Sequence, residues 1–169
     1  FEVKATHIPD TEMPDASYYG HPSPNYPFAA HAAEVEVDPE TGRTKVVGYW
    51  AVHDSGTIIH ETMARSQVYG AVAQGIGWVL MEDFIVENGR VRNGSMMDYR
   101  IPGAKDIPPI NVEFIQEEDP NGPMGAKSIG EVALDPVPGA IANAIAHATG
   151  KRFMRLPISA ERVWSMLRG

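Results

Sequence analysis

The first regular pattern along the chain is an alternation of polar and apolar positions. Residues 34–37 read Glu-Val-Glu-Val, the period of two that is typical of a half-buried β-strand. Residues 44–53 are rich in β-branched and aromatic side chains and predict a second strand. The Asp-Pro-Glu-Thr-Gly turn at 38–42 joins the two into a predicted hairpin. Residues 110–116 alternate again and predict a further strand.

Residues 61–82 follow a helical period instead. One face of this predicted helix is apolar, and it consists of Val68, Val72, Ile76 and Val79. A second face consists of Gln67, Gly70, Gln74 and Gly77. Glycine inside a helix costs about 1 kcal/mol relative to alanine, so we expect a neighbouring group to approach this helix closely.

Three shorter elements follow from turn and capping signals. Asn-Gly inside residues 84–91 predicts a small hairpin. The alanine-rich stretch 138–149 predicts a helix that ends at Gly150. Ser159 is a predicted N-cap of a last helix, with Glu161 in its first turn. Together the patterns predict an α+β fold in which β-hairpins and strands pack with three helices.

The first 27 residues have no such period. A short strand is predicted over residues 1–7, and the prolines between residues 9 and 27 then exclude a regular helix or a central strand. We therefore divide the chain into an extended proline-rich arm at 1–27, which packs on a partner chain, and a folded part at 28–169.

Composition narrows the classes of function. The chain has 169 residues, a net charge of −8 and no basic stripe, which argues against nucleic-acid binding. It has no cysteine, so it has no thiolate ligands, and any iron–sulfur centre has its ligands on another chain. No apolar run is long enough to span a membrane, and the opening residues are not a signal peptide. We expect a cytoplasmic protein that is a processed chain or a piece of a longer polypeptide.

The stretch GAKSIGE at residues 125–131 is the main candidate for chemistry, because it sets one lysine and one glutamate among small residues. Three interpretations stay open. A phosphate-binding P-loop needs glycine directly before the lysine, where this chain has Ala126. The stretch is otherwise a plain glycine turn or a nest of backbone amides that binds a polar group. Glu131 at its end, if desolvated, is suited to act as a general base.

Other kinds of site have weaker signals. The six histidines, His7, His21, His31, His53, His60 and His147, form no metal-ligand spacing, although His53 and His60 lie seven residues apart. The GxSxG motif of serine hydrolases is absent, and Ser55 and Ser128 are the nearest candidate nucleophiles.

Several motifs in order resemble one known family. They are AAEVEVDPETG, HDSG, QVYGAVAQGIGWVLMEDF, DYRIPGAKDIPPINVEF, GPMGAKSIGE, PGAIANAIAHATGKR and LPISAERV. From about residue 28 to its end, the chain is similar to the C-terminal part of the molybdenum-binding large subunit of the xanthine oxidase and aldehyde oxidoreductase family, the molybdenum hydroxylases. The resemblance makes residues 28–169 a C-terminal molybdopterin-binding subdomain, part of a larger molybdenum-binding domain.

The resemblance also implies roles for individual residues. It implies that Glu131 is the catalytic base beside the molybdenum and that Gln67 contacts the pterin. It places four loop residues near the cofactor: Ala126, Lys127, Ser128 and Gly130. It implies no metal ligand from this chain. The sequence departs from the family pattern at His60-Glu61, where Asn-Pro is usual, at Ser128, where glycine is common, and at residues 132–134, where prolines are usual.

The implied reaction is insertion of water-derived oxygen at an electron-poor carbon of a small molecule. Relatives in the family oxidise purines, N-heterocycles, aldehydes and carbon monoxide. The implied cofactor is molybdopterin, in its simple or cytosine dinucleotide form, and electrons leave through iron–sulfur centres and FAD on partner chains or domains. The implied partners are a larger molybdenum-subunit chain, an iron–sulfur subunit and an FAD subunit. The alternatives are a non-catalytic scaffold of the same fold and a chaperone-like module that binds the pterin.

Overall fold

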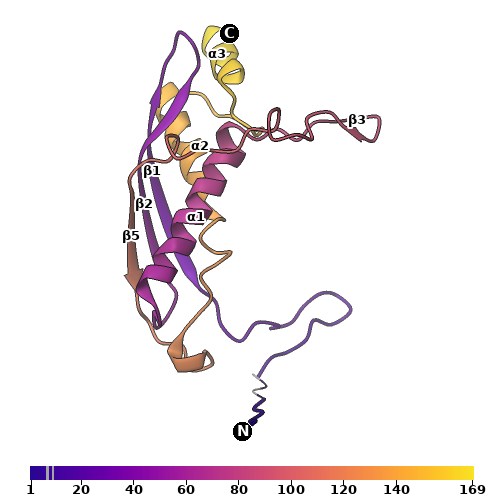
Figure 1. Ribbon diagram of the computed structural model, residues 1–169, viewed down its shortest axis with the longest axis vertical. Coiled ribbons are helices and arrows are strands. Elements are labelled where there is room, and N and C mark those ends of the chain that lie inside the picture. Colours follow the sequence, from indigo (N-terminus) through magenta and orange to yellow (C-terminus); the bar gives the residue numbers. More distant parts are fainter. Residues whose placement is uncertain (7, 9) are drawn as a thin grey trace.

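The fold is built on a three-stranded sheet with two helices against one face (Figure 1). The computed structural model describes residues 1–6, 8 and 10–169. The sheet has the order β1-β2-β5, from β1 (Phe28–Val37), β2 (Thr44–Asp54) and β5 (Ile110–Ile115). Strands β1 and β2 form the predicted antiparallel hairpin, and β5 pairs with β2 in parallel. The predicted α+β class is confirmed.

The alternation along β2 decides which side of the sheet is covered. Tyr49, Ala51 and His53 are buried, while Trp50 and Val52 between them are exposed on the opposite side. The turn before β2 closes as its residues predict, because the carboxylate of Asp38 accepts hydrogen bonds from Glu40 and Thr41.

Two helices cover the buried side. Helix α1 (Glu61–Leu80) connects β2 to β5, and α2 (Pro136–Thr149) packs on β1 and on α1 (Figure 1). The predicted apolar stripe of α1 is confirmed, since Val68, Val72, Ile76 and Val79 are all buried. From α2 the core receives Val137, Ile141 and Ile145.

The glycines inside α1 occupy their positions for different structural reasons. A Cβ on Gly75 would lie 2.4 Å from Cγ1 of Val137, so Gly75 lets α2 approach closely. A Cβ on Gly77 would lie 2.1 Å from Oε1 of Glu82 and 2.7 Å from Cδ of Pro102. Gly70, in contrast, has no atom within 4 Å of the added Cβ. Only Gly70 therefore leaves open space beside the helix.

Two arms project from the body on the side of α1 (Figure 1). One belongs to the N-terminal region, where the described residues 1–6, 8 and 10–27 are mostly exposed. The other carries the predicted small hairpin, β3 (Val86–Glu87) and β4 (Arg90–Val91), with Asn88 and Gly89 at positive φ in its turn. The strand predicted over residues 1–7 is not formed over residues 1–6, where no neighbouring strand offers hydrogen bonds, and His7 lies outside the described residues.

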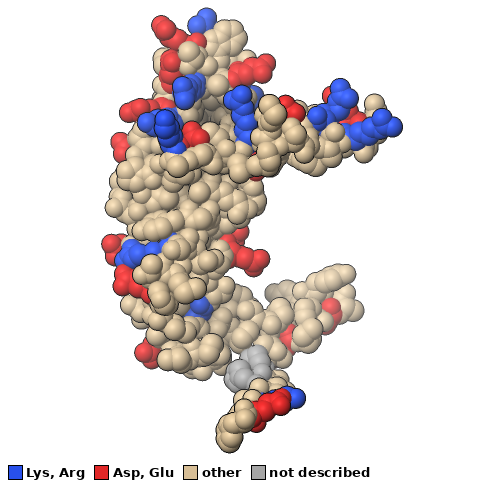
Figure 2. Space-filling model, viewed as in Figure 1, with Lys and Arg blue, Asp and Glu red and all other residues tan. Residues whose placement is uncertain are grey.

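The chain ends in α3 (Ala160–Arg168), whose predicted N-cap Ser159 accepts a hydrogen bond from the amide of Arg162. Among residues 151–169, five are basic and one is acidic. Basic side chains gather at this end and on the hairpin arm, and no continuous basic stripe crosses the face that Figure 2 shows. Within the described part of the chain, no helix has the length and hydrophobicity to span a membrane.

Candidate functional site

Two loops run side by side at one end of the sheet. The first, residues 54–57, follows β2, and the second, residues 125–131, follows a short 3-10 helix, η1 (Pro123–Gly125). Gly56 and Ala126 form an antiparallel bridge. The amide of Lys127 donates to the carbonyl of Ser55 at 2.8 Å, and the amide of Thr57 donates to that of Gly125 at 3.0 Å. The glutamate-bearing loop is therefore fixed to the end of β2.

The glycines at this crossing are required by the chain's own backbone. Gly56 has φ +62°, and a Cβ there would lie 2.1 Å from the carbonyl oxygen of Gly125. Gly125 has φ +80°, and its Cβ would lie 2.8 Å from Oγ1 of Thr57. Gly130 differs, since the nearest atom to its added Cβ is Oε1 of Gln67 at 3.9 Å. At the start of the second loop, small residues are needed because the two loops pack closely against each other. At Gly130 the chain packs against nothing so closely, and open space lies beside it.

A buried ion pair joins the two loops. Nζ of Lys127 lies 2.7 Å from Oδ2 of Asp54, with the two side chains only 8% and 12% exposed. Burial acts to raise the pKa of Asp54, but Lys127 and the amide of Gly56 outweigh burial and hold that pKa below its usual value. The hydrogen bond to Asp54 in turn raises the pKa of Lys127.

A cavity of about 680 Å³ lies between α1 and the end of the second loop. It brings together Gln67, Gly130 and Glu131, three of the residues predicted to form the site. Its other lining residues are Ser66, Gly70, Ala71, Gln74, Leu134 and Asp135. The side chain of Glu131 is exposed in this chain. The cavity thus combines two amides and two carboxylates beside an open stretch of helix.

A second, smaller cavity of about 260 Å³ lies at the start of α1, and Gln67 lines it as well. Ala126 and Lys127 line this cavity, so Gln67 stands between the two groups of predicted residues. The hydroxyl of Ser55 also lines it and has no hydrogen-bond partner among the described residues. Ser128 is exposed and lines neither cavity.

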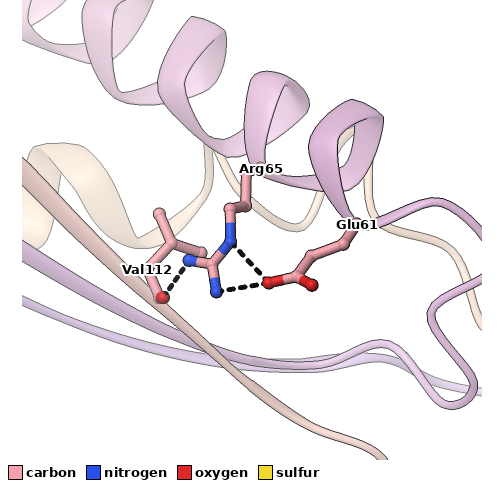
Figure 3. A network of polar contacts seen from close by, with 3 residues as sticks. All are labelled: Glu61, Arg65 and Val112. Carbon is pink, nitrogen blue, oxygen red and sulfur yellow. Dashed lines mark hydrogen bonds and ion pairs between the residues drawn. The ribbon is translucent and has the colours of Figure 1, made fainter.

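Polar contacts fix the start of α1, which carries Gln67. Nδ1 of His60 accepts a hydrogen bond from the amide of Met63 at 3.3 Å, so this histidine caps the helix. The guanidinium of Arg65 donates twice to Oε1 of Glu61, at 2.8 and 2.9 Å, and once to the carbonyl of Val112 on β5 (Figure 3). These contacts hold the first turns of α1 against the edge strand.

The structure supports neither a histidine metal site nor a serine hydrolase. The described residues contain no group of three or more His, Asp or Glu that is arranged to hold a metal ion. The hydroxyl of Ser55 has no hydrogen-bond partner among the described residues, so none of their histidines is placed to activate it. His53 and His60, seven residues apart in the sequence, have separate partners: His53 hydrogen-bonds His31, and His60 caps α1.

Sequence reasoning gave Asp54 and Asp135 no role, considered Ser55 only as a nucleophile, and placed Gln74 on the helix face of Gln67 without a task of its own. Gln74 lies seven residues after Gln67 on the same helix face, so its spacing was a usable signal. Asp54, Ser55 and Asp135 reach the site through loop geometry, which leaves no periodic signal.

Comparisons with known proteins agree on one family. The model of the molybdopterin cofactor-binding domain matches residues 2–108. The chain is 33% identical over 183 residues to the gamma subunit of the 6-hydroxypseudooxynicotine dehydrogenase complex of Paenarthrobacter nicotinovorans, a match that covers 100% of this chain and 23% of that protein. It is 41% identical over 143 residues to the aldehyde oxidoreductase molybdenum-binding subunit PaoC of Escherichia coli, covering 83% of this chain and 20% of that subunit.

A solved structure gives the same result. The aldehyde oxidoreductase from Desulfovibrio gigas superposes with a TM-score of 0.87 at 34% identity, over 94% of this chain and 17% of that one. The chain thus spans about a fifth of the length of the relatives that it matches.

Proposed function

The chain belongs to the molybdopterin cofactor-binding domain family of molybdenum-binding subunits, and we propose that it carries the catalytic base of a molybdenum hydroxylase. The observation that supports this most directly is the larger cavity, where Gln67 on α1 and Glu131 on a distant loop line one space. Chemistry at such a site needs a proton acceptor and a group that orients the cofactor, and these two side chains provide both.

The residues of the cavity fit a large polar ring system. Gly70 and Gly130 leave open space where side chains would otherwise project. The amides of Gln67 and Gln74 line that space, and amides both donate and accept hydrogen bonds. Ser55 offers an unpartnered hydroxyl in the adjoining cavity. The molybdenum cofactor, when bound, would supply the oxidation of an electron-poor carbon with oxygen from water.

Each residue then has a defined task. The carboxylate of Glu131 accepts the proton released from the water that supplies the oxygen, and Gln67 orients the pterin by hydrogen bonds. The loop residues Ala126, Lys127, Ser128 and Gly130 lie beside the cofactor, Lys127 through its backbone. Glu131 is exposed in this chain, so a partner or a further domain completes the water-free surroundings that a base requires.

The remaining properties of the whole enzyme belong to the same proposal. We take the substrate to be an N-heterocycle, a purine or an aldehyde, in line with the names of the relatives. The electrons pass to iron–sulfur and FAD groups on partner chains or domains, and the pterin is in its simple or cytosine dinucleotide form. The larger part of the molybdenum subunit packs on the arm at 1–27, and the assembly is cytoplasmic.

Replacing Glu131 tests the proposal. In the assembled enzyme, Glu131→Gln removes the proton acceptor at constant shape, so turnover falls by about 100-fold or more while molybdenum content stays unchanged. Steady-state kinetics and elemental analysis of the same preparation measure the two quantities. Glu40→Gln in the exposed turn between β1 and β2 is the matched control and keeps full turnover. Full activity of Glu131→Gln would overturn the assignment.

The proposed pterin contact predicts a different outcome at Gln67. Gln67→Ala removes an amide from both cavities, so molybdenum occupancy or thermal stability of the assembly falls. Wild-type occupancy together with wild-type turnover in this variant would count against the contact.

A further inference from the structure

We infer that Asp54 is a positioning residue for the loop that carries Glu131, and that it acts through Lys127. The inference rests on the proposed function, because it concerns how the proposed base is held. It also assigns the ammonium of Lys127 a task inside the protein, in place of the cofactor contact that the resemblance implies for this residue.

The first observation is that the charge of Lys127 is paired with a carboxylate of this chain. Its Nζ lies 2.7 Å from Oδ2 of Asp54, and only 8% of its side chain is exposed. The other carboxylate oxygen of Asp54 accepts a hydrogen bond from the amide of Gly56 at 3.1 Å. A buried pair of this kind has fixed geometry, unlike exposed ion pairs, which are loosely held by long side chains.

The second observation is that this ion pair fixes the beginning of the segment that ends at Glu131. The backbone amide of Lys127 is also bound, to the carbonyl of Ser55 at 2.8 Å. Beyond it, Ser128 and Gly130 are exposed, and the side chain of Ile129 packs against the core. At the far end the carbonyl of Glu131 accepts a hydrogen bond from the amide of Leu134. Lys127 is thus the polar anchor on one side of Glu131.

Loss of the ion pair between Asp54 and Lys127 would have a measurable effect on catalysis, because Glu131 would be held less firmly. Misplacement of a reacting group by about 1 Å costs about 100-fold in rate, and loss of a residue that orients a catalytic group costs about 10- to 100-fold. Asp54 lines neither cavity and Lys127 lines only the smaller one, so their loss leaves the groups around Glu131 in place. The effect is therefore expected in kcat and not in KM or cofactor content.

The test compares three variants in the assembled holoenzyme: Asp54→Asn, Lys127→Met and the double variant that carries both changes. Each single variant leaves one buried charge unpaired and lowers stability, whereas the double variant removes both charges and recovers stability. We expect kcat to fall about 10- to 100-fold in all three, with KM and molybdenum content within about 2-fold of wild type. A kcat that recovers together with the melting temperature in the double variant would reduce the pair to a structural role and overturn the inference.

A second measurement separates this inference from the proposed function. In a Glu131→Gln background, Asp54→Asn has no further effect on the residual turnover, because the base it positions is already absent. An equal fold-loss in both backgrounds would overturn the positioning role. Normal kcat in Asp54→Asn beside an inactive Glu131→Gln would overturn the positioning role alone, while an active Glu131→Gln would overturn the function itself. Glu87→Gln, which removes the exposed ion pair with Arg92 on the hairpin arm, is the control and leaves kcat unchanged.

Discussion

At the scale of single residues, the covered side of the sheet holds a hydrogen-bonded row of three titratable side chains. Nδ1 of His31 lies 3.0 Å from the hydroxyl of Tyr49, and Nε2 of His31 lies 2.9 Å from Nε2 of His53. Burial lowers the pKa of His31 to about 4, with the neighbouring His53 as a second cause, and burial also lowers that of His53. Both imidazoles are therefore neutral at pH 7, and one donates to the other.

This row predicts a loss of stability in mild acid. The pKa of His31 is lower in the folded chain than its ordinary value of 6.5, so the unfolded chain binds the proton more tightly. Stability falls as the pH drops from about 6.5 towards 4. Thermal unfolding of His31→Leu between these pH values gives a flatter dependence than wild type. The exposed His147→Gln is the control, and equal slopes for wild type and His31→Leu would contradict the prediction.

At this scale, a role in the site was predicted only for residues that a motif carries, and these roles stay predictions. Gln67 and Glu131 follow from the resemblance, and the cavity brings both together. The pairing of Lys127 with Asp54 had no local signal, because it joins two loops far apart in the chain. The same holds for His31, whose partners lie on the neighbouring strand and depend on register.

At the scale of elements, the crossing of α1 and α2 depends on Gly75. The added methyl of alanine would lie 2.4 Å from Cγ1 and 2.6 Å from Cβ of Val137, so the two helices would have to separate. Gly70 lies on the same helix with open space around it, facing the larger cavity. Substitutions at these two glycines therefore separate the effect of close helix packing, at Gly75, from the effect of filling the cavity, at Gly70.

Alanine at Gly75 and alanine at Gly70 are expected to change the free energy of unfolding in opposite directions. Gly75→Ala lowers the free energy of unfolding by up to about 2 kcal/mol, because overpacking costs about 1–3 kcal/mol and the gain in helix propensity is only about 1 kcal/mol. Gly70→Ala raises it by about 0.5–1 kcal/mol, yet lowers molybdenum occupancy of the assembly, since its methyl enters the cavity. Chemical unfolding and elemental analysis measure both. Unchanged occupancy in Gly70→Ala would contradict a cofactor beside this helix.

The elements themselves were largely predictable, because their signals are local. The hairpin turn, the glycine after α2 and the cap of α3 are set by neighbouring residues, and all are confirmed. The strand predicted over residues 1–7 is wrong over the described residues 1–6, since an apolar alternation forms a strand only beside a partner strand. The sequence also could not show why residues 75 and 77 are glycines, because the answer depends on which helix or loop packs against them.

At the scale of the whole molecule, the chain exposes more surface than a compact protein of its mass. Its accessible surface is 11,761 Å², whereas a compact monomer of 18.4 kDa exposes about 8,200 Å². Much of the difference lies in the two arms, which expose large apolar side chains such as Tyr18, Tyr19, Phe84 and Met97. Obligate interfaces bury about 2,000–5,000 Å² or more, counted over both partners, so an excess of about 3,600 Å² on one chain is enough for one large interface.

This excess predicts that the arm at 1–27 serves assembly. Deleting it lowers the amount of intact complex seen by native mass spectrometry, because exposed apolar area that the partner would cover is lost. The pair of changes Tyr18→Ser and Tyr19→Ser reproduces part of the loss, whereas Ser23→Ala does not. Full assembly of the deleted chain would show that the arm has another role.

The bridge between Gly56 and Ala126 also sets an order of events during synthesis. The hairpin of β1 and β2 closes from neighbouring residues, but β2 pairs with β5 only after the whole of α1 has emerged, and α2 covers β1 later still. The two loops of the site therefore meet only after residue 126 has left the ribosome. A nascent chain that lacks this crossing also lacks the larger cavity. Under the proposed function, loading of the cofactor therefore follows folding and is a step that a cell can delay or control.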